Sequence, residues 1–162
     1  MPSPSFRRPL AIVALGLVSA ALLTAALPVV AAVDASQVIT ARQDNLKLLG
    51  KTAKALKAQF EGGAPDKAAV ADEAKTMARL AAALPSWFPA GTGPSSGVKT
   101  AAKAEIWTDP ADFKKASDAL TAQTAKLAQL AATGDMPATG AQAKLVSQAC
   151  GDCHHQFKVK GD

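Results

Sequence analysis

Apolar residues recur every three or four positions over four stretches of the chain. On an α-helix this spacing places them on one face, because successive residues are rotated by about 100°. The pattern therefore predicts four amphipathic helices, which begin near residues 39, 65, 108 and 137 and of which the last ends near 158. Their inward positions are Ile39, Leu46, Leu49, Ala53, Leu56 and Phe60, interrupted by Arg42; Val70, Met77, Leu80 and Leu84; Phe113, Ala116, Leu120, Leu127 and Leu130; and Leu145, Val146, Ala149, Cys153 and Phe157.

The breaks between these stretches predict how the helices are connected. "EGGAP" and "ATGDMP" are short, which favours antiparallel neighbours in an all-α, four-helix bundle. "TDP" at Thr108 to Pro110 predicts the start of the third helix, with a side-chain oxygen as its cap and proline in its first turn.

The connection from "LPSWFPAGTGPSSG" to Trp107 has more than 20 residues, whereas about 2 to 8 are usual in a bundle. It contains Trp87, Phe88, Ile106 and Trp107, whose apolar surface is costly to leave in water. We therefore expect a packed lid, with a loose surface loop as the alternative.

The first 35 residues have the three parts of an export signal. "FRR" is the positive region, "PLAIVALGLVSAALLTAALPVV" the apolar region and "VAAVDA" a run suited to cleavage. We predict a signal peptide at 1–32, cleaved near Ala32 to Ala35, and a bundle domain at 33–162 in the periplasm. A retained membrane anchor is the alternative, because Leu10 to Val33 is nearly long enough to cross a bilayer.

Composition agrees with helices and argues against a nucleic-acid partner. Aromatic residues make up 4% of the chain and tyrosine is absent. The net charge is +5, but without Arg7 and Arg8 of the predicted signal it falls to +3, from 16 basic and 13 acidic residues. The basic residues form no clustered stripe with interleaved aromatics, which nucleic-acid binding usually requires.

The last helix contains the only cysteines and histidines of the chain, within "CGDCHH". Cys150, Cys153 and His154 form C-x-x-C-H, the attachment motif of a c-type haem. Residues three and four apart share a helix face, so two thioether sulfurs and one imidazole are able to meet the same porphyrin. The motif predicts one covalent haem c, with His154 as the proximal iron ligand.

Other chemistries fit these residues less well. A disulfide between Cys150 and Cys153 distorts a helix, and a thioredoxin-like dithiol needs a sheet around it. A zinc site needs converging ligands, but His154 and His155 diverge on a helix. We interpret His155 as a histidine on the solvent side.

The other axial position of the iron decides the function. Methionine there gives a six-coordinate electron carrier, whereas an apolar side chain leaves the iron open to small gases. Met77 lies on an inward helix face and Met136 in a turn, so neither is well placed, although the sequence does not exclude Met77.

Arg42 interrupts the inward face of the first helix, and Leu46 follows one turn later. A buried guanidinium needs an anion, for which a haem propionate is a good candidate, and Leu46 would then cover the porphyrin. Asp44 or another helix is a possible partner instead, and in a further alternative Arg42 extends to the bundle edge.

Four segments resemble cytochrome c′, a class II cytochrome c, in the right order along the whole predicted mature chain. They are "ITARQDNLKLLGKTAKAL", "LPSWFPAGTG", "KAEIWTDPADFK" and "CGDCHHQFK". The resemblance implies that Cys150 and Cys153 are the thioether cysteines and His154 the proximal ligand. It also implies that Arg42 and Gln43 bind the haem propionates.

The resemblance implies three further roles around the haem. Leu46 matches the distal position, where low-spin relatives have methionine, so leucine implies five-coordinate, high-spin iron. Lys158 matches a basic residue beside the proximal pocket, and Trp87 lies in a segment that packs by the haem. Relatives often form homodimers through the first two helices, where this chain has small outward residues such as Ala41 and Ala55.

These observations predict a periplasmic haem protein that binds nitric oxide or carbon monoxide and is also able to transfer electrons to redox partner proteins. The alternative is a six-coordinate, low-spin electron-transfer cytochrome with Met77 as a ligand. We do not expect an enzyme, because the first helix shows no distal histidine or second acid-base group.

Overall fold

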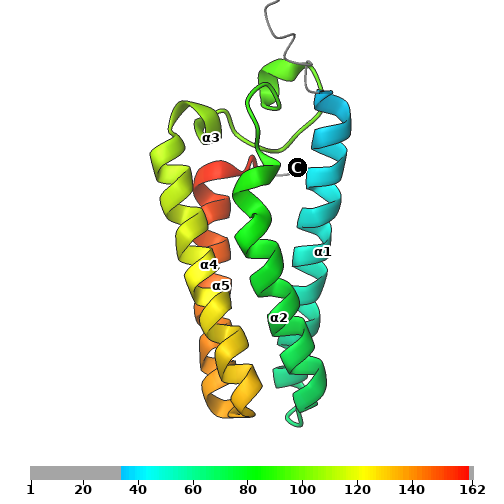
Figure 1. Ribbon diagram of the computed structural model, residues 1–162, viewed down its shortest axis with the longest axis vertical. Helices are drawn as coiled ribbons and strands as arrows, with labels where there is room; N and C mark the ends of the chain where they lie inside the picture. Colours follow the sequence, from blue (N-terminus) through cyan, green and yellow to red (C-terminus); the bar gives the residue numbers. More distant parts are fainter. Residues whose placement is uncertain (1–33, 161–162) are drawn as a thin grey trace, which may run out of the picture. The chain divides into compact units, whose positions relative to one another are not determined.

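The computed structural model describes residues 34–160 as an antiparallel four-helix bundle, which confirms the predicted fold (Figure 1). In Figure 1, α1 and α4 descend while α2 and α5 ascend. No helix within 34–160 is both long enough and apolar enough to cross a bilayer. The predicted signal peptide lies outside the described residues. The four long helices are α1 (Ala35–Glu61), α2 (Lys67–Ala83), α4 (Pro110–Thr133) and α5 (Met136–Phe157).

Aspartate side chains cap three of the long helices. Asp34, Asp66 and Asp135 accept hydrogen bonds from backbone N–H groups in the first turns of α1, α2 and α5. The side-chain cap predicted for the third long helix is wrong, because Asp109 accepts no such bond. Its own N–H instead bonds to Glu105 O at 2.9 Å, so the preceding turn fixes its backbone. Pro110 occupies the first turn of α4 as predicted.

The predicted inward faces form the core. Ile39, Val70, Met77 and Leu127 are at most 1% exposed. Leu145 is the exception, because 46% of its surface is exposed and it was expected to point inward. Val146 was also predicted inward and is confirmed with 2% exposed, and the two neighbours differ because successive helix residues are rotated by about 100°.

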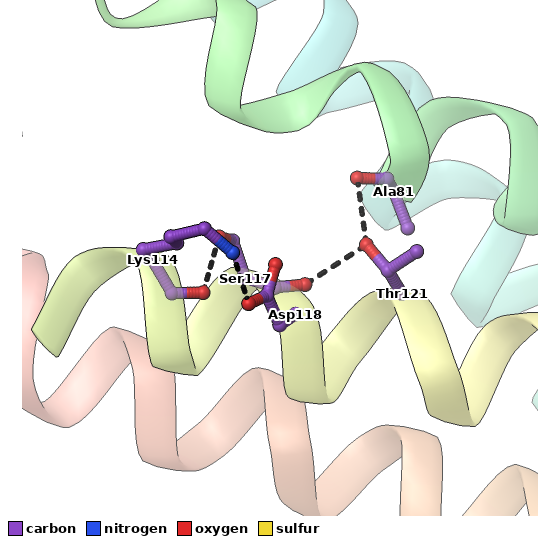
Figure 2. Close-up of polar contacts among 5 residues, drawn as sticks. All are labelled: Ala81, Lys114, Ser117, Asp118 and Thr121. Atoms are coloured by element: carbon purple, nitrogen blue, oxygen red, sulfur yellow. Dashed lines mark hydrogen bonds and ion pairs between the residues drawn. The ribbon is translucent and has the colours of Figure 1, made fainter. Parts of the chain in front are cut away.

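A threonine links α2 to α4 (Figure 2). Thr121 Oγ1 lies 3.3 Å from Ala81 O on α2 and 2.9 Å from Ser117 O on its own helix, so these carbonyls share one hydroxyl hydrogen. Lys114 and Asp118 pair on the exposed side of the same stretch of α4. That pair lies within α4 and an exposed pair contributes little to stability, so of these polar contacts the threonine bond is the one that reaches α2.

The connection between α2 and α4 contains two 3-10 turns and one short helix: η1 (Leu84–Trp87), η2 (Pro94–Ser96) and α3 (Glu105–Thr108). Ile106 is buried, and Trp107 Nε1 lies 3.1 Å from Phe88 O and 3.0 Å from Pro89 O. Gly93 lies against the indole, where a Cβ atom would be only 3.0 Å from Trp107 Cε3. The connection is therefore packed, which confirms the predicted lid.

Three phenylalanines join this connection to both C-terminal helices. The Phe88 and Phe113 rings lie 4.9 Å apart, and the Phe113 and Phe157 rings lie 5.3 Å apart, both edge to face. This is a favoured aromatic geometry. It holds the connection against the start of α4 and the end of α5.

Candidate functional site

The two cysteines lie in the last turns of α5 and form no disulfide with each other. Cys150 and Cys153 are half-buried and pack against the hydrophobic core. Burial raises the pKa of both thiols, and the charge of Cys150 raises that of Cys153 further. Both side chains thus lie on one helix face at the bundle interior, as the motif predicts.

His154 and His155 follow in the last turn of α5, and both are exposed residues, although the His154 ring is partly covered. Partial burial of the ring, and then the positive charge of Lys158, lower the pKa of His154. A lowered pKa favours the neutral imidazole, which is the form that binds a metal. His155 is exposed, which confirms its predicted position on the solvent side.

The donor set fits a porphyrin better than a lone metal ion. Within residues 34–160, no three histidine, cysteine or acidic side chains converge on one point. Two thiols three residues apart on one face, followed by an imidazole, match the needs of a covalent haem, which brings its own four nitrogen ligands.

Arg42 is buried on α1 with 2% of its surface exposed, so the alternative that it extends to the bundle edge is wrong. Its Nη1 donates to Thr92 Oγ1 at 3.1 Å, and its Nη2 donates to Thr92 O and Thr100 Oγ1, both at 3.0 Å. The Cζ atom lies 4.8 Å from the Phe88 ring centroid and 5.7 Å from that of Trp107. Burial lowers the pKa of Arg42.

The partners of Arg42 within residues 34–160 are neutral. Asp44, which the sequence left open as a partner, instead pairs with Lys47 at 3.0 Å. A guanidinium has five N–H donors, of which the three bonds to the connection use three. Two donors and an uncompensated positive charge remain, so a propionate partner stays a prediction that the local chemistry favours.

The neighbours of Arg42 on α1 have different surroundings. Leu46, one turn later, is half-buried and packs on the core, in agreement with an inward apolar wall. Gln43 is exposed and its Nε2 donates to Lys99 O at 3.2 Å. Gln43 and Arg42 therefore hold the same connection from one helix.

The remaining predicted site residues lie in separate places. Trp87 is half-buried in η1 against the core. Lys158 ends α5 and is exposed, and its backbone pairs with Ala102. Met77 is 1% exposed in the core, and Met136 begins α5, 14 residues before Cys150 or about 21 Å along the axis.

Sequence reasoning missed the partners of Arg42. Thr92 is fully buried and also donates from Oγ1 to Pro89 O at 2.8 Å, and Thr100 is half-buried. Short polar residues in a connection have no periodicity, and these lie 50 and 58 positions from Arg42. The one available signal was that a buried arginine needs acceptors.

Comparisons with known proteins agree on one family. The family model described as Cytochrome C′ matches residues 37–158. A cytochrome c′ from Rhodospirillum rubrum is 37% identical over 123 residues, which are 75% of this chain and 77% of that protein.

Solved structures resemble the bundle as well. A cytochrome c′ from Alcaligenes xylosoxidans, solved as a ferrous variant with bound NO, has a TM-score of 0.72 at 27% identity, over 80% of this chain and 99% of that one. A cytochrome c′ with an unusual ligand-controlled dimer dissociation has a TM-score of 0.73 at 27% identity, over 80% of this chain and 100% of that one.

Proposed function

The chain belongs to the cytochrome c′ family, and from that premise we propose that it binds nitric oxide or carbon monoxide at a high-spin, five-coordinate haem iron. Its cofactor is haem c, which this family carries covalently, and Cys150 and Cys153 have the required spacing. When bound, the haem supplies an iron that takes a diatomic gas and changes oxidation state.

The residues of this chain divide the work of holding that group. Cys150 and Cys153 attach it, and His154 in its neutral form is the protein ligand to the iron. Arg42 has two N–H donors left for a propionate, and Gln43 lies next to it on the same helix. Trp87 and Lys158 are assigned to the surroundings of the haem by the family resemblance alone.

One observation carries the proposal: Leu46 stands one turn beyond buried Arg42 and packs against the same core as the two cysteines. A leucine side chain has no atom that coordinates iron and no hydrogen-bond donor for bound oxygen. It leaves the distal side apolar, which suits nitric oxide and carbon monoxide.

The spin state of the purified ferric protein tests this proposal. We expect high-spin absorption and paramagnetic resonance spectra. We also expect the absorption spectrum of the ferrous protein to change when carbon monoxide binds. A low-spin ferric spectrum with a methionine-to-iron charge-transfer band would contradict it.

The alternative is a six-coordinate electron-transfer cytochrome in which Met77 binds the iron. The complete burial of Met77 is the observation in its favour. Met77→Leu decides between the two, because loss of a thioether ligand shifts the spectrum and lowers the reduction potential. Our proposal expects an unchanged spectrum from this volume-conserving change.

The wider setting follows from the same reading. The export signal predicted at residues 1–32 supports a periplasmic protein, and we propose reversible binding and electron exchange with redox partner proteins without catalytic turnover. A relative with ligand-controlled dimer dissociation supports a homodimer. Sedimentation with and without carbon monoxide tests the dimer, and a mass at one monomer under both conditions would contradict it.

A further inference from the structure

Five consecutive residues of the long connection, 99–103, link α1 to the end of α5, and we call them the strap. Its first two residues are held from α1. Gln43 Nε2 donates to Lys99 O at 3.2 Å, and Arg42 Nη2 donates to Thr100 Oγ1 at 3.0 Å. Because Arg42 is buried and Thr100 half-buried, the bond that anchors the strap is partly shielded from water.

The other three residues of the strap are held by the end of α5. Val159 N donates to Ala101 O at 2.8 Å, and Lys103 N donates to Phe157 O at 2.9 Å, with an isolated antiparallel bridge between them. Lys103 Nζ also donates to His155 O at 3.3 Å. The last carbonyls of a helix lack hydrogen-bond donors within the helix, and Lys103 of the strap donates to two of these carbonyls in α5.

The strap joins two helices that otherwise touch little. α1 packs mainly on α2, and α5 packs mainly on α4. Within the described part of the chain, no side-chain hydrogen bond runs directly from α1 to α5. Yet α1 carries Arg42 and Leu46, and α5 carries Cys150, Cys153 and His154.

We propose that the strap sets the separation between the apolar wall on α1 and the haem-bearing turns of α5, with Arg42, Gln43 and Thr100 as positioning residues. The proposal rests on the proposed function only in assigning the haem to this site. If the α1 side of the strap is released, its bonds to α5 should open more often and Leu46 should confine the site less. The hydrogen bonds of the Thr100 side chain go to Arg42 and to the Ala102 amide and not to α5, so an effect on the bonds to α5 would be transmitted along the strap.

Thr100→Val in the haem-loaded protein tests the proposal by amide hydrogen exchange. It removes one of the three acceptors of Arg42, together with the acceptor of the Ala102 amide, and keeps the side-chain shape. We expect exchange at the Lys103 and Val159 amides to rise about tenfold, because release of the strap from α1 no longer breaks the part-buried Arg42–Thr100 hydrogen bond. Thr108→Val is the matched control, because Thr108 is exposed in the same connection and bonds only within its own turn. Acceleration confined to the Ala102 amide, which itself bonds to Thr100 Oγ1, would overturn the proposal.

A second readout separates positioning from local stability. We expect carbon monoxide to bind ferrous Thr100→Val a few-fold faster than the wild type and Thr108→Val at the wild-type rate. Accelerated exchange with an unchanged binding rate would overturn the positioning role. Absence of carbon monoxide binding in the wild type would refute the proposed function alone. The exchange comparison would still decide whether release of the strap from α1 weakens its bonds to α5.

Gln43→Ala gives the same test at a milder site. Its side chain is exposed, so the variant should fold even if the buried one does not. Exposed Gln37 on the same helix supplies the control, Gln37→Ala. We expect a smaller rise in exchange at Lys103 and Val159 with Gln43→Ala and none with Gln37→Ala, and equal exchange in both would overturn the proposal.

Discussion

The two ends of the bundle are built in different ways (Figure 1). At the turn end, which holds the α1–α2 and α4–α5 links, each device acts within a few residues: Asp66 and Asp135 cap the following helices and Gly134 ends α4 with φ 75°. At the loop end, which holds residues 84–109, Arg42 is bound by residues 50 and 58 positions away.

The difference shows which end of the bundle contains an energetically unfavourable buried charge. A buried cation with neutral partners is expensive, whereas the capping carboxylates Asp66 and Asp135 of the turn end are exposed. The loop end accepts that cost where α1 and α5 bring the site residues together. Changes at the loop end should therefore alter the cofactor site, while changes at the turn end should alter stability alone.

The largest effect is expected from Cys150→Ala with Cys153→Ala. This variant has no thioether attachment, and the bound haem would add packing at the bundle interior, so we expect no covalent haem and poor folding. Absorption of the denatured protein and circular dichroism measure both. A fully folded bundle without haem would contradict the central role of the cofactor.

Arg42→Leu should destabilise the protein by about 3 kcal/mol, because it leaves both buried acceptors on Thr92 without their arginine donor and removes one of the two donors to Thr100 Oγ1. Chemical denaturation of the haem-loaded protein gives the value. Arg79→Leu on the exposed surface is the control and should stay within about 0.5 kcal/mol of the wild type. Equal losses in the two variants would remove the contrast between buried and exposed arginine.

Leu46→Ala should cost about 2 kcal/mol, at the low end for leucine because the side chain is half-buried. It should also accelerate carbon monoxide binding to the ferrous protein, since the truncated wall opens the distal side. Stopped-flow mixing measures the rate, with Leu48→Ala on the exposed face of α1 as the control. An unchanged binding rate would contradict the assignment of Leu46 to the distal side of the haem.

Asp66→Ala at the turn end should cost about 1 kcal/mol through loss of the cap on α2. Ferric spectrum and carbon monoxide binding should both match the wild type. Thermal melting and the same ligand measurements check the prediction. A changed spectrum would show that the two ends are coupled.

The smallest effect is expected at Glu73, whose Oε2 is buried without a hydrogen-bond partner. Burial raises the pKa of Glu73, so its protonated form suits the fold and its charged form opposes it. Its favourable contribution is present below the ordinary glutamate pKa and is lost as pH rises through the raised value. Glu73→Gln should therefore be slightly more stable than the wild type at neutral pH, and the gain should vanish in acid. Asp72→Asn is the control, and an equal gain there would point to net charge instead.

The same contrast explains what the sequence could predict. Inward positions such as Val70 and Leu127 follow from periodicity, and the attachment motif lies within one helix, so both are local patterns. Thr92 and Thr100 have no such pattern, because their role depends on where the chain folds back. Asp109 is of a residue type that caps helices, so the local sequence predicted a cap there. The preceding turn fixes its backbone instead, and its side chain caps nothing.

The strap meets α5 mostly through main-chain atoms, namely Ala101 O, Lys103 N and the backbone of residues 157–159. Main-chain hydrogen bonds do not depend on side-chain identity, so many substitutions of Ala101 or Ala102 should leave them intact. Proline is different, because at 103 or 159 it would delete the donor itself. The strap should therefore accept many residue types at these positions, but not proline at 103 or 159.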